Sequence, residues 1–339
     1  MKEPGPGWPD PLRREVALSY TLALPVLGVP VRFESTSAAV IRIAEEAYGG
    51  WRVLLNRPDL IADDQVRIRV FVEEVDAPLQ ARPAMVYRLA DPDRVVLRTR
   101  GCVGVTDVAR RDGVAWVDPA LVADRETFRY AVLEAMTQSV LTFLDRMPMH
   151  AAAIERDGTA LLLAGPSGSG KSTLTYAAAR CGFRVLAEDL VFVQSVPDFR
   201  VWGLPGYIHL PLTARDRFPD LAETLPRLLA NGKEKIAVPL AGIGAMPDLP
   251  VVPRAGICVL ARASGAPQLS RVTGHTLEKE LSERLEPGFD RFRESVGDVI
   301  RHLARHGGWR LALSPDPAEA LPYIERMFEA IEAATLAVD

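Results

Sequence analysis

Apolar and polar residues along the first part of the chain follow the short periods that are typical of strands. Residues 19–34 predict two strands around a turn, and residues 64–75 (DQVRIRVFVEEV) alternate as a half-buried strand does. Residues 84–119 predict a meander of short strands. Helical spacing follows the Ser/Thr-rich start of residues 35–51 and recurs from about residue 125 to residue 147. These elements predict an α+β domain with an antiparallel sheet.

The middle of the chain has a different pattern, in which apolar runs are nearly continuous. Residues 149–165 (MHAAAIERDGTALLLAG) predict two strands joined at an Arg-Asp-Gly turn. A glycine-rich loop follows, and then residues 171–181 predict a helix that stops at Gly182, the residue type expected just past a helix end. Residues 183–194 (FRVLAEDLVFVQ) predict one strand with an acidic pair in its middle.

The remaining residues predict further strands and helices. We expect a proline-punctuated strand or loop at 200–213, a partly polar helix at 214–231, strands at 232–240, 255–263 and 309–313, and helices at 275–286, 288–306 and 317–336. Together the patterns predict a flexible N-terminus (1–14), an α+β domain of open role (15–147) that is a candidate for substrate recognition, and a second domain (148–339).

Composition narrows the class of protein. The 339 residues carry a formal net charge of −4, which provides no basic field for nucleic acid. The polar, proline-rich start of the chain lacks the apolar core of a signal peptide, and no apolar run is long and uninterrupted enough for a membrane span. Three scattered cysteines fit a reducing compartment. We therefore expect a cytoplasmic protein with no nucleic-acid or membrane partner.

The most specific motif is residues 165–172, GPSGSGKS, which matches the phosphate-binding P-loop pattern G-x-x-x-x-G-K-[ST]. Glycines let backbone N–H groups point inward at oxyanions, and the helix that follows directs its positive end at the same phosphates. Lys171 is expected to reach the β- and γ-phosphates, and the Ser172 hydroxyl to bind Mg²⁺. The predicted cofactors are ATP, or another nucleoside triphosphate, and Mg²⁺. The predicted nucleotide-binding residues are Gly165, Ser167, Gly168, Ser169, Gly170, Lys171, Ser172 and Thr173.

Several classes of nucleotide-binding protein share this loop but carry further motifs that this sequence lacks. No Leu-Ser-Gly-Gly-Gln-like signature of a transport ATPase is present, and neither asparagine of the chain lies in the base-recognition motif of a switch GTPase. Residues 183–212 hold only two arginines, Arg184 and Arg200, whereas small nucleotide kinases carry an arginine-rich lid.

Residues 149–193 resemble the catalytic core of HPr kinase/phosphorylase and its serine-kinase relatives. The resemblance rests on His150 fifteen residues before Gly165, on the P-loop itself, and on Glu188 and Asp189 sixteen and seventeen residues after Ser172. It implies an α/β P-loop kinase core of the HPr kinase/phosphoenolpyruvate carboxykinase type, preceded here by the smaller α+β domain. It implies transfer of a γ-phosphoryl group to a serine hydroxyl of a protein or peptide, such as a natural-product precursor peptide.

The resemblance also assigns roles to the acidic pair. Glu188 occupies the position of the catalytic base and Asp189 that of the metal-side acid, next to Ser172 as the other metal ligand. Adjacent carboxylates in a strand point to opposite faces, which agrees with separate roles. The family usually has Asp where this chain has Glu188. His150 is expected to act electrostatically near the transferred phosphate or the acidic pair.

Three further residues are weaker candidates for contact with substrate or phosphate. Lys233 and Lys235 are two of only five lysines in the chain, and they flank Glu234 just before an apolar run. His209 lies in a turn-rich segment with aromatic neighbours. A solvated loop and ordinary packing are the alternative interpretations of these residues.

Two other functions stay open at this point. One is an ATP-binding regulatory or assembly protein that transfers nothing, and the other is a small-molecule kinase built on the same fold. The family is often hexameric, which leaves homo-oligomerisation open. No signature for the reverse phosphorylase activity is evident, so that activity is not predicted.

Overall fold

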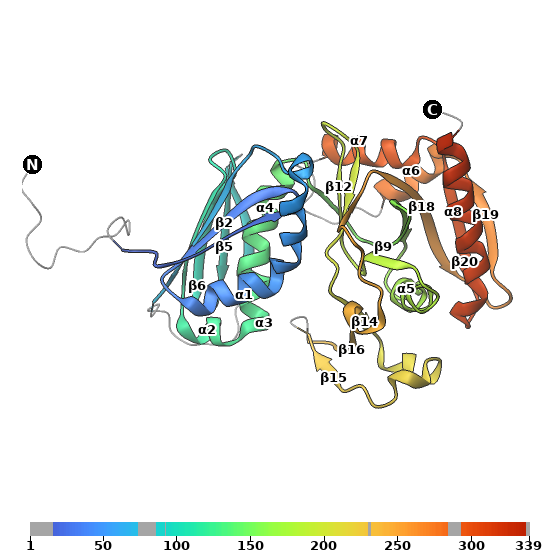
Figure 1. The fold of residues 1–339 in the computed structure, drawn as a ribbon, viewed down its shortest axis with the longest axis horizontal. Helices are drawn as coiled ribbons and strands as arrows, with labels where there is room; N and C mark the ends of the chain where they lie inside the picture. The colour runs from blue at the N-terminus through green and yellow to red at the C-terminus, as the bar shows by residue number, and fades with distance from the viewer. Residues whose placement is uncertain (1–15, 74–85, 92, 230–231, 284–292, 337–339) are drawn as a thin grey trace, which may run out of the picture. The chain divides into compact units, whose positions relative to one another are not determined.

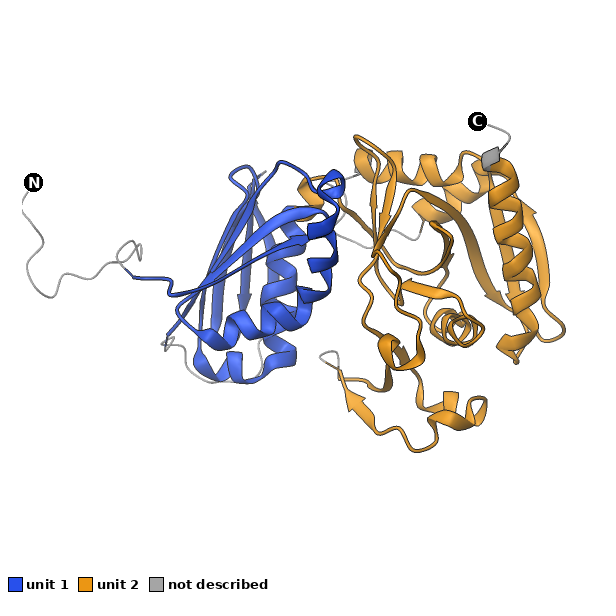
Figure 2. Ribbon diagram, viewed as in Figure 1, with its two compact units in different colours: residues 1–140 blue, residues 141–339 orange. Residues whose placement is uncertain are grey.

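The computed structural model describes residues 16–73, 86–91, 93–229, 232–283 and 293–336. The chain divides into two compact units, residues 1–140 and residues 141–339 (Figure 2). The predicted flexible segment 1–14 lies outside the described residues.

Unit 1 contains a seven-stranded sheet with the order β1-β2-β3-β7-β6-β5-β4. Its strands are β1 (Tyr20–Val26), β2 (Val29–Ser35), β3 (Val66–Val72), β4 (Val86–Asp91), β5 (Arg94–Thr99), β6 (Cys102–Asp107) and β7 (Asp112–Val117). The prediction of an antiparallel sheet was wrong for β3, which runs parallel to both β2 and β7. The helical connection between β2 and β3 is long enough to return the chain to the same end of the sheet, and this allows parallel pairing.

The helices of unit 1 begin with α1 (Ala38–Tyr48), whose first turn is capped by the Ser37 side chain. Short 3-10 helices at Gly49–Asn56 and Pro58–Leu60 follow it. After the sheet come α2 (Pro119–Ala123), α3 (Arg125–Phe128), a π-helical stretch (Arg129–Glu134) and α4 (Ala135–Phe143).

The last of these helices ends earlier than the sequence predicts. Instead of continuing to Met147, it stops at Phe143, and Asp145 adopts a left-handed backbone with φ of 60°. The Asp145 carboxylate accepts hydrogen bonds from the backbone N–H groups of Ser195 and Val196, at 3.0 and 2.8 Å. This long-range contact favours the turn over further helix, and Met147 begins a strand.

Unit 2 contains a six-stranded sheet with the order β11-β9-β10-β18-β20-β19 (Figure 1). Its strands are β9 (Ala151–Arg156), β10 (Thr159–Ala164), β11 (Arg184–Ala187), β18 (Arg254–Arg262), β19 (Gln268–Val272) and β20 (Gly308–Leu313). The central strands β10, β18 and β20 are parallel.

A second sheet, β17-β13-β12-β8, contains β8 (Met147–Met149), β12 (Val191–Gln194), β13 (Arg200–Trp202) and β17 (Val251–Val252). A third, β14-β16-β15, contains β14 (Tyr207–Leu210), β15 (Pro226–Leu228) and β16 (Glu234–Pro239).

Helices cover both faces of the six-stranded sheet, which explains the nearly continuous apolar run of β10. Leu161 and Leu163 pack on one face in a cluster with α5 (Lys171–Arg180) and α8 (Leu321–Leu336). Leu162 and the flanking alanines pack on the other face in a cluster with α6 (Gly274–Ser282) and α7 (Arg293–Ala304). The mixed α/β class expected for this half of the chain is therefore observed.

Two predicted elements of unit 2 were wrong. Residues 183–194 form two strands that belong to different sheets, with β11 paired to β9 and β12 paired to β8 and β13. The predicted helix at residues 214–231 is not observed: its described part begins within the 3-10 turn Leu212–Asp216 and continues through the 3-10 turn Pro219–Leu221 and the strand β15. Pro219 and Pro226 interrupt that segment and make a continuous helix unfavourable.

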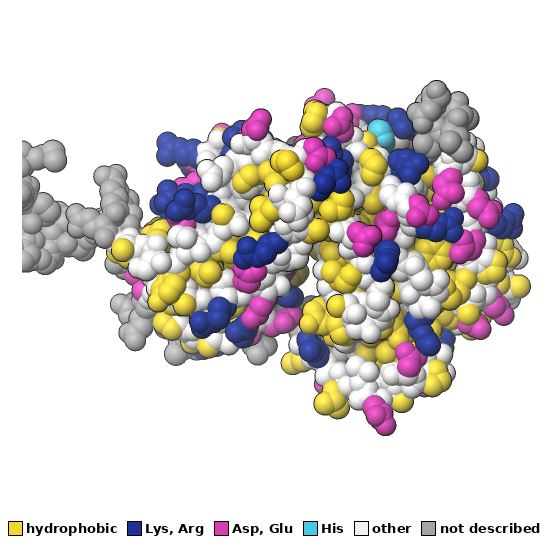
Figure 3. Space-filling model, in the orientation of Figure 1, with side chains coloured by type: hydrophobic (Ala, Val, Ile, Leu, Met, Phe, Trp, Pro, Cys, Tyr) yellow, Lys and Arg dark blue, Asp and Glu magenta, His cyan; other side chains and the backbone are white. Residues whose placement is uncertain are grey.

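The charged side chains of the face drawn in Figure 3 are interspersed by sign. Among the described residues, none of the helices combines the length and the apolar character that a bilayer crossing requires.

Candidate functional site

The P-loop connects β10 to α5, as the sequence predicts, and tight local turns hold it in place. The β9–β10 hairpin turns at Asp157 and Gly158, whose φ values of 49° and 74° are those of a two-residue turn with both residues left-handed. At the far end of α5, Gly182 has a φ of 95°, and its N–H donates to the Ala179 carbonyl. The helix stop predicted at Gly182 is thus confirmed.

Two features of the loop suit an anion. Gly168 and Gly170 have φ values of 80° and 106°, which side-chain-bearing residues rarely adopt, and these conformations curl the backbone around the start of α5. The Ser169 Oγ atom is buried and has no hydrogen-bond partner among the described residues. An unpartnered buried hydroxyl next to a helix N-terminus fits a phosphate group.

The Lys171 side chain is folded against the loop. Its Nζ atom donates to the carbonyl oxygens of Gly165, at 2.7 Å, and Pro166, at 3.3 Å. The residue is only 7% exposed. The ammonium group is therefore held inside the curve of the loop, where a phosphate would need a counter-charge.

A hydrogen-bonded group of three side chains lies beside the first turn of α5. The Ser172 hydroxyl donates to Glu188 Oε1, and His209 Nδ1 lies 3.3 Å from Glu188 Oε2. Glu188 is 8% exposed and lies in the bend between β11 and β12, while His209 comes from β14. Three segments that are distant in the sequence therefore converge on one buried carboxylate.

The surroundings of Glu188 keep it ionised. Burial alone would raise the pKa of Glu188, but the hydrogen bonds from His209 and Ser172 and the charges of His209 and Lys235 outweigh it, so the pKa lies below its usual value. Glu188 is therefore a carboxylate at neutral pH, which is the form that accepts hydrogen bonds and binds cations.

Asp189 lies in a different environment from its neighbour. Its Oδ1 atom is 3.4 Å from His150 Nδ1, and both side chains are substantially exposed. The structure thus separates the acidic pair as expected, but not through the alternation of a strand, because both residues lie between strands. Glu188, and not Asp189, contacts Ser172, which is opposite to the sequence-based division of roles.

The other candidate residues lie at varying distances from this cluster. Ser167 is exposed on the loop, and Thr173 lies in the first turn of α5. Lys235 is half-buried in β16, and its charge acts on Glu188. Lys233 is exposed in the turn before β16. Of the three weaker candidates, His209 and Lys235 belong to the surroundings of Glu188.

Arg262 is a residue of the site that sequence reasoning missed. It ends β18, and its Nε atom donates to the Gly168 carbonyl at 3.1 Å. β18 runs parallel to β10, so the two strands end at the same edge of the sheet. A positively charged residue at the carboxyl end of a predicted neighbouring strand was the signal that could have identified it.

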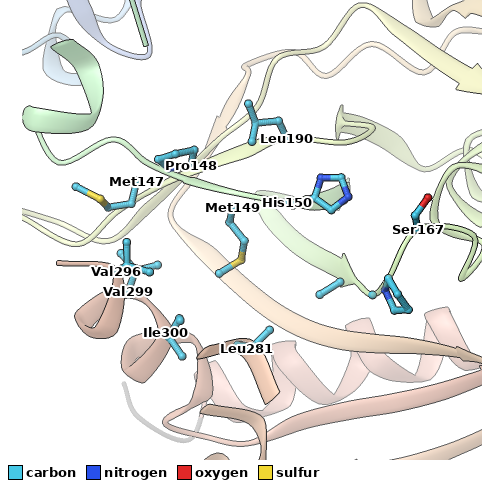
Figure 4. Close-up of a pocket in the computed structure, with 13 residues that line it drawn as sticks. Met147, Pro148, Met149, His150, Ser167, Leu190, Leu281, Val296, Val299 and Ile300 are labelled. Atoms are coloured by element: carbon cyan, nitrogen blue, oxygen red, sulfur yellow. The ribbon is translucent and has the colours of Figure 1, made fainter. Parts of the chain in front are cut away.

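A cavity of about 400 Å³ adjoins the loop (Figure 4). His150 and the loop residues Gly165–Ser167 line one end of it. Apolar side chains from β8, α6 and α7, together with Ala164 at the end of β10 and Leu190 before β12, line the rest. Nothing in the sequence pattern indicated this cavity, because its walls come from five separate segments.

Comparison with known proteins adds little to this geometry. No family model matches the chain, and no curated protein matches it. One similar solved structure is the Hpr(Ser) kinase/phosphatase from Coxiella burnetii, which is 15% identical in sequence and has a TM-score of 0.31. That match covers 56% of this chain and 99% of the other. A TM-score this low supports no functional inference, so function has to be derived from the site.

Proposed function

We propose that this protein is an ATP- and Mg²⁺-dependent kinase that transfers the γ-phosphoryl group to a serine hydroxyl of a protein or peptide. The observation that carries the proposal is the pair of acidic environments beside the P-loop. Glu188 is buried and accepts a hydrogen bond from the Ser172 hydroxyl. The next residue, Asp189, is exposed and lies beside His150. A protein that only binds nucleotide needs the first of these, whereas phosphoryl transfer also needs a group that receives the acceptor.

The first group of residues would hold the nucleotide and metal. The Ser169 hydroxyl, which is buried without a hydrogen-bond partner among the described residues, would contact phosphate oxygens, and Lys171 would supply the positive charge for the terminal phosphates. Ser172 and Glu188 are the oxygen ligands, direct or through water, that suit Mg²⁺. Bound Mg²⁺ neutralises charge on the phosphoryl oxygens. His209 is a positioning residue, because it acts on the site by holding Glu188.

The second group would act on the acceptor. Asp189 is exposed enough to meet an incoming serine hydroxyl and, as a carboxylate, to accept its proton. His150 orients Asp189 through their contact at 3.4 Å. The serine oxygen then forms a bond to the γ-phosphorus, and the bond from that phosphorus to the bridging oxygen breaks, which releases the nucleoside diphosphate. In this proposal Asp189 is the base and Glu188 the metal-side acid.

The experiment that tests the function follows a labelled γ-phosphate. The purified protein is incubated with γ-labelled ATP, Mg²⁺ and a size-fractionated lysate of its host. We expect label on a macromolecule or peptide, and Lys171→Ala should reduce the transfer by roughly 100- to 1,000-fold, as the loss of one charge-stabilising group does in other enzymes. Lys279→Ala is the matched control, because it removes an exposed lysine of α6 that is not part of the site.

Three results would contradict the proposal. Full transfer by Lys171→Ala would show that the loop does not carry the chemistry. Label on a small metabolite would indicate a small-molecule kinase. Tight ATP binding with no labelled acceptor in any fraction would favour a regulatory ATP-binding protein.

A second pair of variants tests the division of roles. Glu188→Gln should raise the Mg²⁺ concentration needed for half-maximal transfer, because the metal loses a charged neighbour. Asp189→Asn should lower kcat and leave that Mg²⁺ concentration within about twofold, in keeping with a base that is not a metal ligand. The opposite pattern would restore the roles expected from the sequence.

A further inference from the structure

Most of the side chains that line the cavity beside the P-loop are apolar. Met147 and Met149 come from β8, Leu281 from α6, and Val296 and Ile300 from α7. Among the described residues that line it, His150 and Ser167 are the ones with polar side chains. Figure 4 shows Met147, Val296 and Ile300 on one side of the cavity, and His150 and Ser167 on the other side, toward the loop. The part of the cavity away from His150 and Ser167 therefore favours a group that is uncharged and apolar.

The polar end of the cavity coincides with the acceptor side of the proposed site. His150 lines the cavity and contacts Asp189, whose neighbour Glu188 contacts Ser172. In this loop motif the lysine and the following hydroxyl mark the β- and γ-phosphate end of the nucleotide. Within the proposed function, His150 thus links the cavity to the side of the site where the acceptor would arrive.

We propose that this cavity is a specificity pocket that takes an apolar side chain of the acceptor peptide, next to the serine that is phosphorylated. This inference rests on the proposed function. Roughly 150 Å³ is enough to hold a benzene molecule in a protein interior, so about 400 Å³ accommodates one aromatic side chain or a large aliphatic one. His150 at the mouth then lies beside the peptide backbone and Asp189 beside the serine hydroxyl.

The test uses matched peptides in which one position beside a central serine is Gly, Asp, Leu, Phe or Trp, in a background of glycines. Each peptide carries a fluorescent label, and its affinity for the full chain is measured by anisotropy with Mg²⁺ and a non-hydrolysable ATP analogue. Transfer from ATP to each peptide is measured separately. We expect Phe or Leu beside the serine to tighten binding at least tenfold over Gly, and Asp to give no gain.

Variants of the cavity locate the effect. Val296→Phe fills the cavity and should remove the preference for Phe over Gly, while the affinity for a fluorescent ATP analogue stays unchanged. Glu294→Phe adds the same ring to an exposed position of α7 and should leave the preference intact. Met149→Ala enlarges the cavity and should shift the preference from Phe toward Trp, which provides a test that does not depend on tolerance of the buried ring.

The outcomes separate this inference from the proposed function. Equal binding of all the peptides would overturn the pocket assignment, whether or not transfer occurs. Selective binding without transfer to any peptide would support the pocket and overturn the kinase function. If Val296→Phe weakens the ATP analogue and spares the peptide preference, the cavity holds the nucleotide base and the inference is wrong.

Discussion

Gly168 and Gly170, two of the P-loop glycines with positive φ, allow a quantitative test of how tightly the loop is built. Gly168 has a φ of 80°, and a Cβ atom added there would meet no atom within 4 Å. Gly170 has a φ of 106°, and its added Cβ would lie 2.9 Å from Leu313 Cδ1 and 3.2 Å from Arg262 Cζ. Substitution by alanine therefore strains the backbone at both positions but crowds neighbours at only one.

The magnitudes follow from these distances. Alanine at Gly168 should cost about 1–2 kcal/mol of unfolding free energy, the penalty for a left-handed residue with a Cβ. Alanine at Gly170 carries a backbone penalty of ~1–3 kcal/mol, because its φ lies beyond the left-handed minimum. It also displaces Leu313 and Arg262, which typically costs ~1–3 kcal/mol. We expect Gly170→Ala to be less stable than Gly168→Ala by about 1–3 kcal/mol.

The assay should report on unit 2 alone, and Cys258 provides the probe. This cysteine is fully buried in β18 opposite Leu163 of β10, so its thiol becomes accessible when the sheet opens. Pulsed thiol labelling along a urea gradient, read at the peptide that contains Cys258, gives the unfolding free energy of each variant. Equal destabilisation of the two variants, or a larger effect at Gly168, would refute the steric reasoning.

Two further predictions follow from burial and charge. Burial raises the pKa of the Cys102 and Cys258 thiols to about 12, whereas Cys181 is exposed. A maleimide should therefore label Cys181 alone in the native protein and all three thiols in denaturant, and rapid native labelling of Cys102 or Cys258 would contradict their burial. The pKa of Glu188 is lower in the folded protein, so its contribution to stability is present above about pH 4.5, the usual carboxyl value, and is lost as the pH falls through the lower folded pKa. Glu188→Gln should lower the unfolding free energy at pH 7 by ~1–3 kcal/mol. Urea titrations at several pH values should show that this difference from wild type shrinks in acid. A difference that grows in acid would contradict the predicted direction of the pKa shift.

The sequence by itself determined the features that depend on neighbours along the chain. The β9–β10 hairpin, the P-loop between a strand and a helix, and the stop of α5 at Gly182 were all predicted, and the structure contains them. Each is set by local chemistry, namely turn residues that tolerate positive φ and apolar residues at a fixed period. The prediction that His150, Glu188 and Asp189 gather near the loop came from spacing and resemblance.

Tertiary structure decided the features that depend on which strands pair. The run 183–194 is equally compatible with one long strand or two short ones, and only its pairing with β9 and with β8 and β13 breaks it at Glu188. That break turns Glu188 toward Ser172 and leaves Asp189 exposed beside His150. Arg262 and the apolar cavity likewise bring together segments that are far apart in sequence. Sequence periodicity specifies which face of an element is apolar, but not which distant element covers it, and so the different contacts of Glu188 and Asp189 could not be predicted from the sequence.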